Sequence, residues 1–95
     1  MKYIISESRL DSIMTEYLDS FFLNKEISDN EVAIMVYDND DEDYFQYFHK
    51  KKELFILDEF LDEFEDMFGL SRTKSLKFIS KWFENEFGVD VRNAG

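Results

Sequence analysis

The spacing of the apolar residues changes twice along the chain, from helical to extended and back, and this limits the possible folds most. Between residues 10 and 22 apolar side chains recur at the three- and four-residue spacing of an amphipathic helix: Leu10, Ile13, Met14, Tyr17, Leu18, Phe21 and Phe22. Ser8 followed by Asp11 is similar to a capping box, so we predict a helix over about residues 8–23. The short apolar segment 2–5 ahead of it is predicted to be extended.

The middle of the chain is typical of three short strands. Residues 32–37 form a continuous run of β-branched, aromatic and other apolar residues, which favours a buried strand. The acidic segment 38–43 has the composition of a solvated turn. Residues 44–49 and 54–57 resemble two further strands, separated by lysines at 50–52. The sequence therefore predicts a three-stranded antiparallel meander.

Helical spacing returns after residue 57. The apolar residues of this segment share one face: Phe60, Leu61, Phe64, Met67 and Phe68. Gly69 suits a left-handed C-cap, and a last helix is predicted from a cap at Ser71 to a stop at Gly88, with one face marked by Leu76, Ile79, Phe83 and Phe87. Residues 89–91 are predicted to be an edge strand or a docked tail. One continuous helix over 53–68 is an open alternative to a strand followed by a helix.

These elements predict one α+β domain over residues 1–95. An N-terminal helix precedes the three-stranded antiparallel meander, and a C-terminal helical hairpin packs on one face of the sheet. A chain of 95 residues forms one domain with a thin core, and here the core material is aromatic, with 11 Phe, 5 Tyr and 1 Trp.

The composition excludes several kinds of chemistry. The chain has no cysteine, so it carries no disulfide, zinc-thiolate site or cysteine nucleophile. Its single histidine has no nucleophilic partner implied by spacing, and three glycines cannot build a phosphate-binding loop. The acidic turn fails as a calcium loop, because Asp43 and His49 stand where an EF-hand needs glycine and glutamate. We expect no cofactor, no bound metal and no enzymatic activity.

The charge is strongly negative and unevenly distributed. The net charge is −11, with −13 on residues 1–70 and +2 on residues 71–95. Such a field repels nucleic acid and anionic lipid and attracts basic protein surfaces. The apolar runs are too short to cross a membrane, so we expect a cytoplasmic protein that does not bind membranes.

Two acidic segments are candidates for the partner-binding surface. Carboxylates one helical turn apart recur at a spacing comparable with the phosphates of DNA, so this surface could imitate DNA. A solvated face without a function is the alternative interpretation. The candidate residues are Asp38, Asp40, Asp41, Glu42 and Asp43 in the turn and Asp58, Glu59, Asp62, Glu63 and Asp66 in the helix.

The segment from Gly69 onward resembles a helix-turn-helix and gives a second hypothesis. A glycine turn is followed by a basic helix, in which DNA would be contacted by Arg72, Thr73, Lys74 and Lys77. Glu65 stands where that motif needs a small residue, and Ser75 stands where it needs an apolar one. Nucleic acid is therefore the less favoured partner.

Aromatic residues supply a third hypothesis, a structural or assembly role through apolar contacts. So small a core cannot enclose all 17 aromatic side chains, and exposed ones make good anchors for a partner or for a second copy of the chain. The candidates are Phe21, Phe22, Tyr44, Tyr47 and Trp82.

The two ends of the chain resemble small proteins of tailed bacteriophages to which no chemistry is assigned. At the start the resemblance rests on residues 2–10 and on Tyr17 and Leu18. At the end it rests on residues 68–71, on Ser75, Ile79, Trp82 and Glu84, and on residues 91–93. The resemblance covers about half the chain. It implies a host cytoplasm or a virion as the location, and a host or phage protein as the partner.

Overall fold

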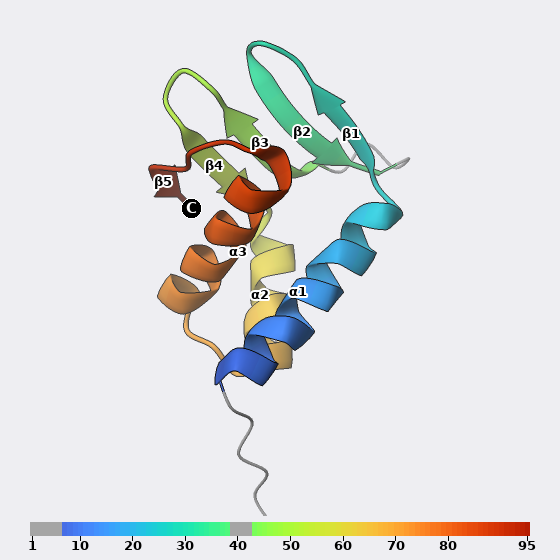
Figure 1. The fold of residues 1–95 in the computed structure, drawn as a ribbon, viewed down its shortest axis with the longest axis vertical. Helices are drawn as coiled ribbons and strands as arrows, with labels where there is room; N and C mark the ends of the chain where they lie inside the picture. The colour runs from blue at the N-terminus through green and yellow to red at the C-terminus, as the bar shows by residue number, and fades with distance from the viewer. Residues whose placement is uncertain (1–6, 39–42) are drawn as a thin grey trace, which may run out of the picture.

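The computed structural model describes residues 7–38 and 43–95 and contains three helices and five strands. The predicted extended segment 2–5 and the turn residues 39–42 lie outside the described residues. Figure 1 shows the sheet at one end of the molecule and the helices extending from it. In chain order the elements are α1 (Glu7–Leu23), β1 (Glu26–Asp29), β2 (Ala33–Tyr37), β3 (Asp43–Phe48), β4 (Glu53–Ile56), α2 (Asp58–Phe68), α3 (Arg72–Phe87) and β5 (Asn93–Ala94).

The sheet has five strands in the order β1-β2-β3-β4-β5, so the predicted meander forms only its centre. β1 to β4 are antiparallel neighbours, and β5 pairs with β4 in parallel. The three predicted strands are confirmed as β2, β3 and β4. The single helix over 53–68 is wrong, because residues 53–56 pair with β3 and α2 begins at Asp58.

The prediction missed β1, which has only one apolar residue, Ile27, among its four. The tight turn after β1 brings it onto β2. The Asn30 side-chain oxygen accepts hydrogen bonds from the backbone N–H groups of Val32 (2.8 Å) and Ala33 (3.0 Å). Asparagine commonly forms such hydrogen bonds in tight turns. The sequence feature that could have indicated β1 was therefore the turn residue Asn30, because the strand itself has no apolar pattern.

The C-terminal strand lies later in the chain than predicted. Residues 89–91 form no strand, and β5 covers Asn93 and Ala94. Its hydrogen bonds run to the β3–β4 turn and to β4: the N–H groups of Arg92 and Asn93 donate to the Lys52 carbonyl, and the N–H of Gly95 donates to the Leu54 carbonyl. A strand of two residues has no apolar alternation in the sequence, so its position is determined only by this pairing.

The predicted helix ends are confirmed with one small difference. α1 begins at Glu7, so Ser8 lies inside its first turn instead of before it. Ser71 caps α3 by accepting a hydrogen bond from the Lys74 N–H, and both Gly69 and Gly88 adopt the left-handed conformation at φ +63°. Only glycine takes that conformation without strain, which is why each helix stops there.

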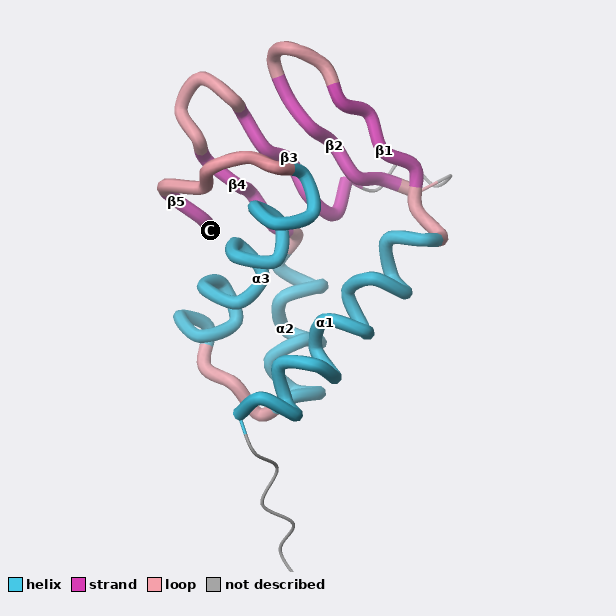
Figure 2. Tube along the Cα trace, viewed as in Figure 1, coloured by secondary structure: helices cyan, strands magenta, loops and turns pink. Residues whose placement is uncertain are grey.

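The core lies between one face of the sheet and all three helices, as the separation of strands and helices in Figure 2 illustrates. Phe45 of β3 is fully buried at its centre. Its ring contacts one aromatic ring from each helix: Phe22 of α1 (4.9 Å between centroids), Phe60 of α2 (5.2 Å) and Phe83 of α3 (6.4 Å). The predicted packing of a C-terminal hairpin on one face of the sheet is therefore incomplete, because α1 packs on the same core.

Substitution Phe45→Ala should lower the free energy of unfolding by about 3–5 kcal/mol, because it leaves a cavity where three helices meet. The matched control is Phe55→Ala on the opposite face of the sheet, where the ring is 47 % exposed and should contribute far less. Urea unfolding followed by circular dichroism measures both. Equal losses for the two variants would contradict a core centred on Phe45.

Candidate functional site

The carboxylates of α2 fall into two rows, and Arg72 holds the first of them. The inner row consists of Asp58, Asp62 and Glu65. Arg72 opens α3, just after the turn at Gly69, and its guanidinium faces back toward α2. Nη1 lies 3.5 Å from Asp58 Oδ1, Nε lies 2.9 Å from Glu65 Oε2, and Nη2 donates to Asp62 Oδ1.

Arg72 therefore reduces the repulsion within the inner row and ties α2 to α3. Like charges one turn apart oppose helix formation, and a shared guanidinium offsets that effect. This arrangement also engages Arg72 in ion pairs at the surface, whereas the helix-turn-helix hypothesis assigned it to DNA. Asp58 and Asp62, both candidates for the acidic surface, belong to this paired row.

The outer row of α2 consists of Glu59, Glu63 and Asp66, which form no ion pair among the described residues. All three are exposed. Glu59 and Glu63 border a shallow hollow of about 240 Å³ whose other walls are Phe21, Tyr44, Leu57 and Phe60. The outer row is thus a line of unpaired carboxylates beside an aromatic surface.

Tyr17 shows how close the outer row lies to the aromatic cluster. Its pKa is raised, first by burial and then by the negative charge of Glu63. The Tyr17 ring packs against Phe60, Phe64 and Phe68, with centroid separations of 5.7–6.3 Å. The charge of Glu63 therefore acts on Tyr17, whose ring belongs to this aromatic cluster.

The first residue of the acidic turn lies on the same side of the molecule. The Tyr44 hydroxyl donates to Asp38 Oδ2 at 2.9 Å, and the Tyr44 ring forms part of the hollow beside Glu59 and Glu63. The Lys25 ammonium lies over the Tyr44 ring, 5.1 Å from its centroid. We name Asp38, Glu59, Glu63 and Asp66 the acidic face.

The other residues of the acidic turn are placed differently or not described. Asp43 is the first residue of β3, and its Oδ2 accepts a hydrogen bond from Gln46 Nε2 at 3.0 Å. Asp40, Asp41 and Glu42 lie outside the described residues. The structure therefore brings Asp38 together with the outer row of α2 and leaves Asp43 within the sheet.

The basic candidates on α3 have different surroundings. All four are exposed, and Arg72 also forms ion pairs with α2. Thr73 and Lys77 line a groove against the C-terminal segment, together with residues that the sequence did not single out. Ser75 is fully buried, and its hydroxyl has no hydrogen-bond partner among the described residues.

Three of the five aromatic candidates for an interface lie in the core. Phe22, Tyr47 and Trp82 are buried, and the Trp82 indole N–H donates to Asp19 Oδ1 at 3.0 Å. Phe21 and Tyr44 are half-buried and border the acidic face. Of the five candidates, the two that are not buried thus lie beside the carboxylates, an arrangement that no sequence pattern could have indicated.

Comparisons add no relative to this description. The chain matches no protein-family model, no curated protein and no solved structure. Among residues 7–38 and 43–95, no helix is long and apolar enough to span a bilayer, and no three histidine or acidic side chains gather as metal ligands would. The functional argument therefore rests on the geometry of the molecule itself.

Replacing Arg72 by Met should destabilise the fold by about 1 kcal/mol at low salt, because three carboxylates lose their shared cation. The difference from wild type should shrink in 1 M salt, where exposed charges are screened. Lys74→Met is the matched control, since Lys74 is exposed, lies in the same helical turn and forms no ion pair among the described residues. Equal effects in thermal unfolding would show that Arg72 does not join the helices.

The stabilising effect of Tyr47 is expected to decrease at alkaline pH. Its hydroxyl donates to the Asp90 carbonyl, and its pKa is raised by burial, with further contributions from Asp90 and Glu84. Because folding favours the neutral phenol, its stabilising effect is complete below the unfolded pKa of 10.0 and is lost as the pH rises through the higher folded pKa. Tyr47→Phe should cost about 1 kcal/mol at pH 8 and less near pH 11, measured by urea unfolding. An unchanged difference at both pH values would contradict this role.

Proposed function

We propose that the protein is a non-enzymatic protein-binding module that binds a basic surface of a partner through its acidic face. The observation that carries the proposal is the division of the α2 carboxylates. Arg72 engages the inner row, and the outer row is left exposed beside Phe21 and Tyr44. Unpaired carboxylates suit a partner surface rich in lysine and arginine, through ion pairs.

The sharpest form of this proposal is imitation of DNA. Glu59 and Glu63 are one helical turn apart, about 6 Å along the axis, and Asp66 continues the row. Successive phosphates of a DNA strand recur at comparable distances, so a nucleic-acid-binding protein would meet a similar charge pattern. We further propose, from the resemblance to bacteriophage proteins, that such a partner is a host or phage protein and that the protein acts in the host cytoplasm.

A structural role in a virion or an assembly is the main alternative. It would depend on apolar contacts, and the exposed faces offer some: Phe55 on the sheet and Leu23 at the end of α1 are 47 % and 83 % exposed. Such contacts persist at high salt, whereas binding through the acidic face weakens. Salt dependence therefore separates the two roles.

The test is a tagged pull-down from bacterial lysate with the variant Glu59→Lys/Glu63→Lys/Asp66→Lys. We expect wild type to retain a nucleic-acid-binding protein, high salt to release it, duplex DNA to displace it, and the triple variant to lose at least tenfold in binding. The control, Glu26→Lys/Glu31→Lys/Glu86→Lys, makes the same charge change at exposed acids outside the acidic face and should bind as wild type does. Equal loss in both variants would mean that net charge alone governs binding. Retention that survives both high salt and the triple variant would instead favour the assembly role.

A further inference from the structure

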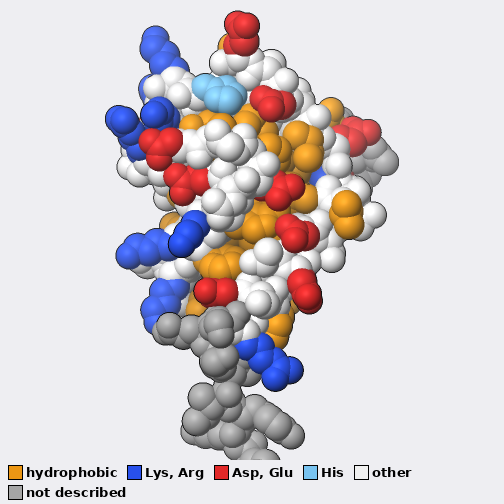
Figure 3. Space-filling model, in the orientation of Figure 1, with side chains coloured by type: hydrophobic (Ala, Val, Ile, Leu, Met, Phe, Trp, Pro, Cys, Tyr) orange, Lys and Arg blue, Asp and Glu red, His pale blue; other side chains and the backbone are white. Residues whose placement is uncertain are grey.

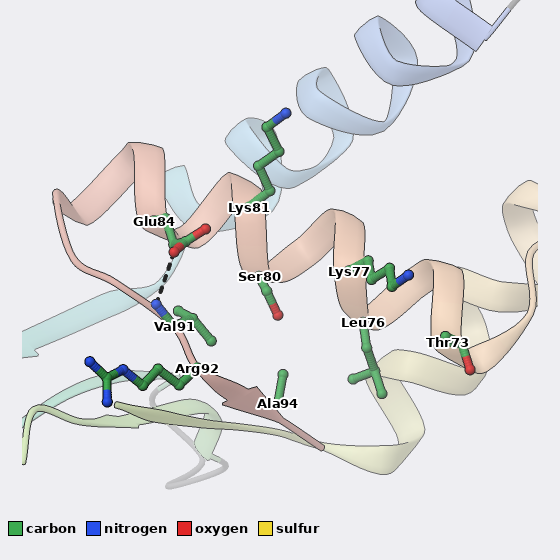
Figure 4. A pocket seen from close by; sticks show the side chains of 9 residues that line it. All are labelled: Thr73, Leu76, Lys77, Ser80, Lys81, Glu84, Val91, Arg92 and Ala94. Atoms are coloured by element: carbon green, nitrogen blue, oxygen red, sulfur yellow. Dashed lines mark hydrogen bonds between the residues drawn. The ribbon is translucent and has the colours of Figure 1, made fainter. Parts of the chain in front are cut away.

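A groove of about 460 Å³ runs between α3 and the C-terminal segment, a volume within the ordinary range of ligand sites. Figure 4 shows α3 on one side and β5 on the other, with the side chains of Leu76 and Ser80 directed toward β5. Val91 and Ala94 complete the apolar part of its lining, and Thr73 adds a hydroxyl near the start of the helix.

The groove is positively charged on a protein whose net charge is −11. Lys77, Lys81 and Arg92 line it, with the Lys81 side chain extending away from β5 in Figure 4, and Figure 3 shows Lys and Arg side chains gathered on the side of the molecule that carries α3, β5 and the β3–β4 turn. Lys77 and Lys81 form no ion pair among the described residues, and Arg92 Nε is 3.8 Å from Asp90. The single carboxylate of the groove, Glu84, accepts a hydrogen bond from the Val91 N–H at 3.0 Å.

The groove also has a strand edge along one wall. The Gly95 N–H donates to the Leu54 carbonyl, and the Gly95 carbonyl accepts from the Ile56 N–H, so Gly95 faces β4. Successive residues of a strand direct their backbone groups to opposite sides. The N–H and C=O of Ala94, a residue that lines the groove, therefore point away from β4, along an edge that pairs with no other strand of the described residues.

This edge is held in place before any partner arrives. The Tyr47 hydroxyl donates to the Asp90 carbonyl, Glu84 accepts from Val91, and the Arg92 N–H donates to the Lys52 carbonyl at 2.8 Å. These bonds come from β3, α3 and the β3–β4 turn. A preformed edge lowers the conformational entropy lost when a peptide adds to it.

We propose that this groove binds an extended acidic segment of a partner protein, which adds to the sheet as a strand beside β5. Main-chain hydrogen bonds to Ala94 would supply affinity, and carboxylates meeting Lys77, Lys81 and Arg92 would supply specificity. Residues two apart in a strand are about 6.7 Å apart. Lys77 and Lys81 are four apart on α3, about 6 Å along its axis. The preferred segment therefore carries acidic residues at alternate positions.

The same features favour a peptide over nucleic acid. An apolar lining of Leu76, Val91 and Ala94 and a strand edge suit a polypeptide backbone, and neither matches a chain of phosphates. The charge of −13 on residues 1–70 also repels a long polyanion more than a short acidic segment. The groove and the acidic face use different residues, so each can be tested without the other.

The experiment measures fluorescence anisotropy of a labelled peptide, Val-Glu-Val-Glu-Val-Glu-Val, on the full chain. We expect Lys77→Glu/Lys81→Glu to weaken binding at least tenfold. The control variant Lys50→Glu/Lys51→Glu makes the same change of charge at exposed residues of the β3–β4 turn that do not line the groove. It should change the affinity for the peptide less than twofold. Circular dichroism of both variants confirms that they fold.

Two further measurements test strand addition itself. Hydrogen exchange of the Ala94 amide, followed by NMR, should slow at least tenfold when the peptide is bound. N-methylation of two successive central residues of the peptide should abolish binding, because it removes main-chain donors. The proposal is overturned if the peptide does not bind at millimolar concentration, if both double variants bind alike, or if Ala94 exchange is unchanged. Binding of single-stranded DNA through Lys77 and Lys81, with no binding of the peptide, would overturn it in favour of nucleic acid.

Discussion

Contact between Phe45 and one ring from each helix is the interaction on which the other parts of the structure depend. β3 is the central strand of five, and Phe45 stands on its buried face. Because Phe22, Phe60 and Phe83 all meet this ring, the positions of the three helices are fixed relative to the sheet and to each other. A small domain has few core residues, so large rings that each contact several neighbours supply most of its apolar burial.

Placing α2 and α3 on the same core brings Arg72 to the carboxylates of α2. The turn at Gly69 reverses the chain within three residues, and the first side chain of α3 then reaches Asp58, Asp62 and Glu65. The division into a paired inner row and an unpaired outer row is thus a consequence of packing. The proposed acidic face follows from that division, since Arg72 forms ion pairs with the inner row and with none of the outer row among the described residues.

The position of α3 also decides where positive charge gathers. Its buried side packs on Tyr47 through Phe83, with ring centroids 5.5 Å apart, and its exposed side faces the C-terminal segment that Tyr47 and Glu84 hold. The result is a molecule with carboxylates beside the rings of α1 and α2, and cations along α3 and β5. The two proposed partners would therefore meet different residues.

The sequence by itself determined the local elements. Periodicity predicted three helices and the central strands, and Gly69, Ser71 and Gly88 marked helix ends, because backbone conformation and capping depend on neighbouring residues. The residues of the acidic face could also be named from the sequence. Which carboxylates of α2 pair with Arg72 could not. Tertiary structure alone decided which strands lie at the edges, since β1 and β5 have little apolar pattern and exist through pairing with β2 and β4. It likewise decided which carboxylates Arg72 engages and which residues line the groove. These contacts depend on how the helices and strands pack, and the spacing of residues along the chain does not fix that packing.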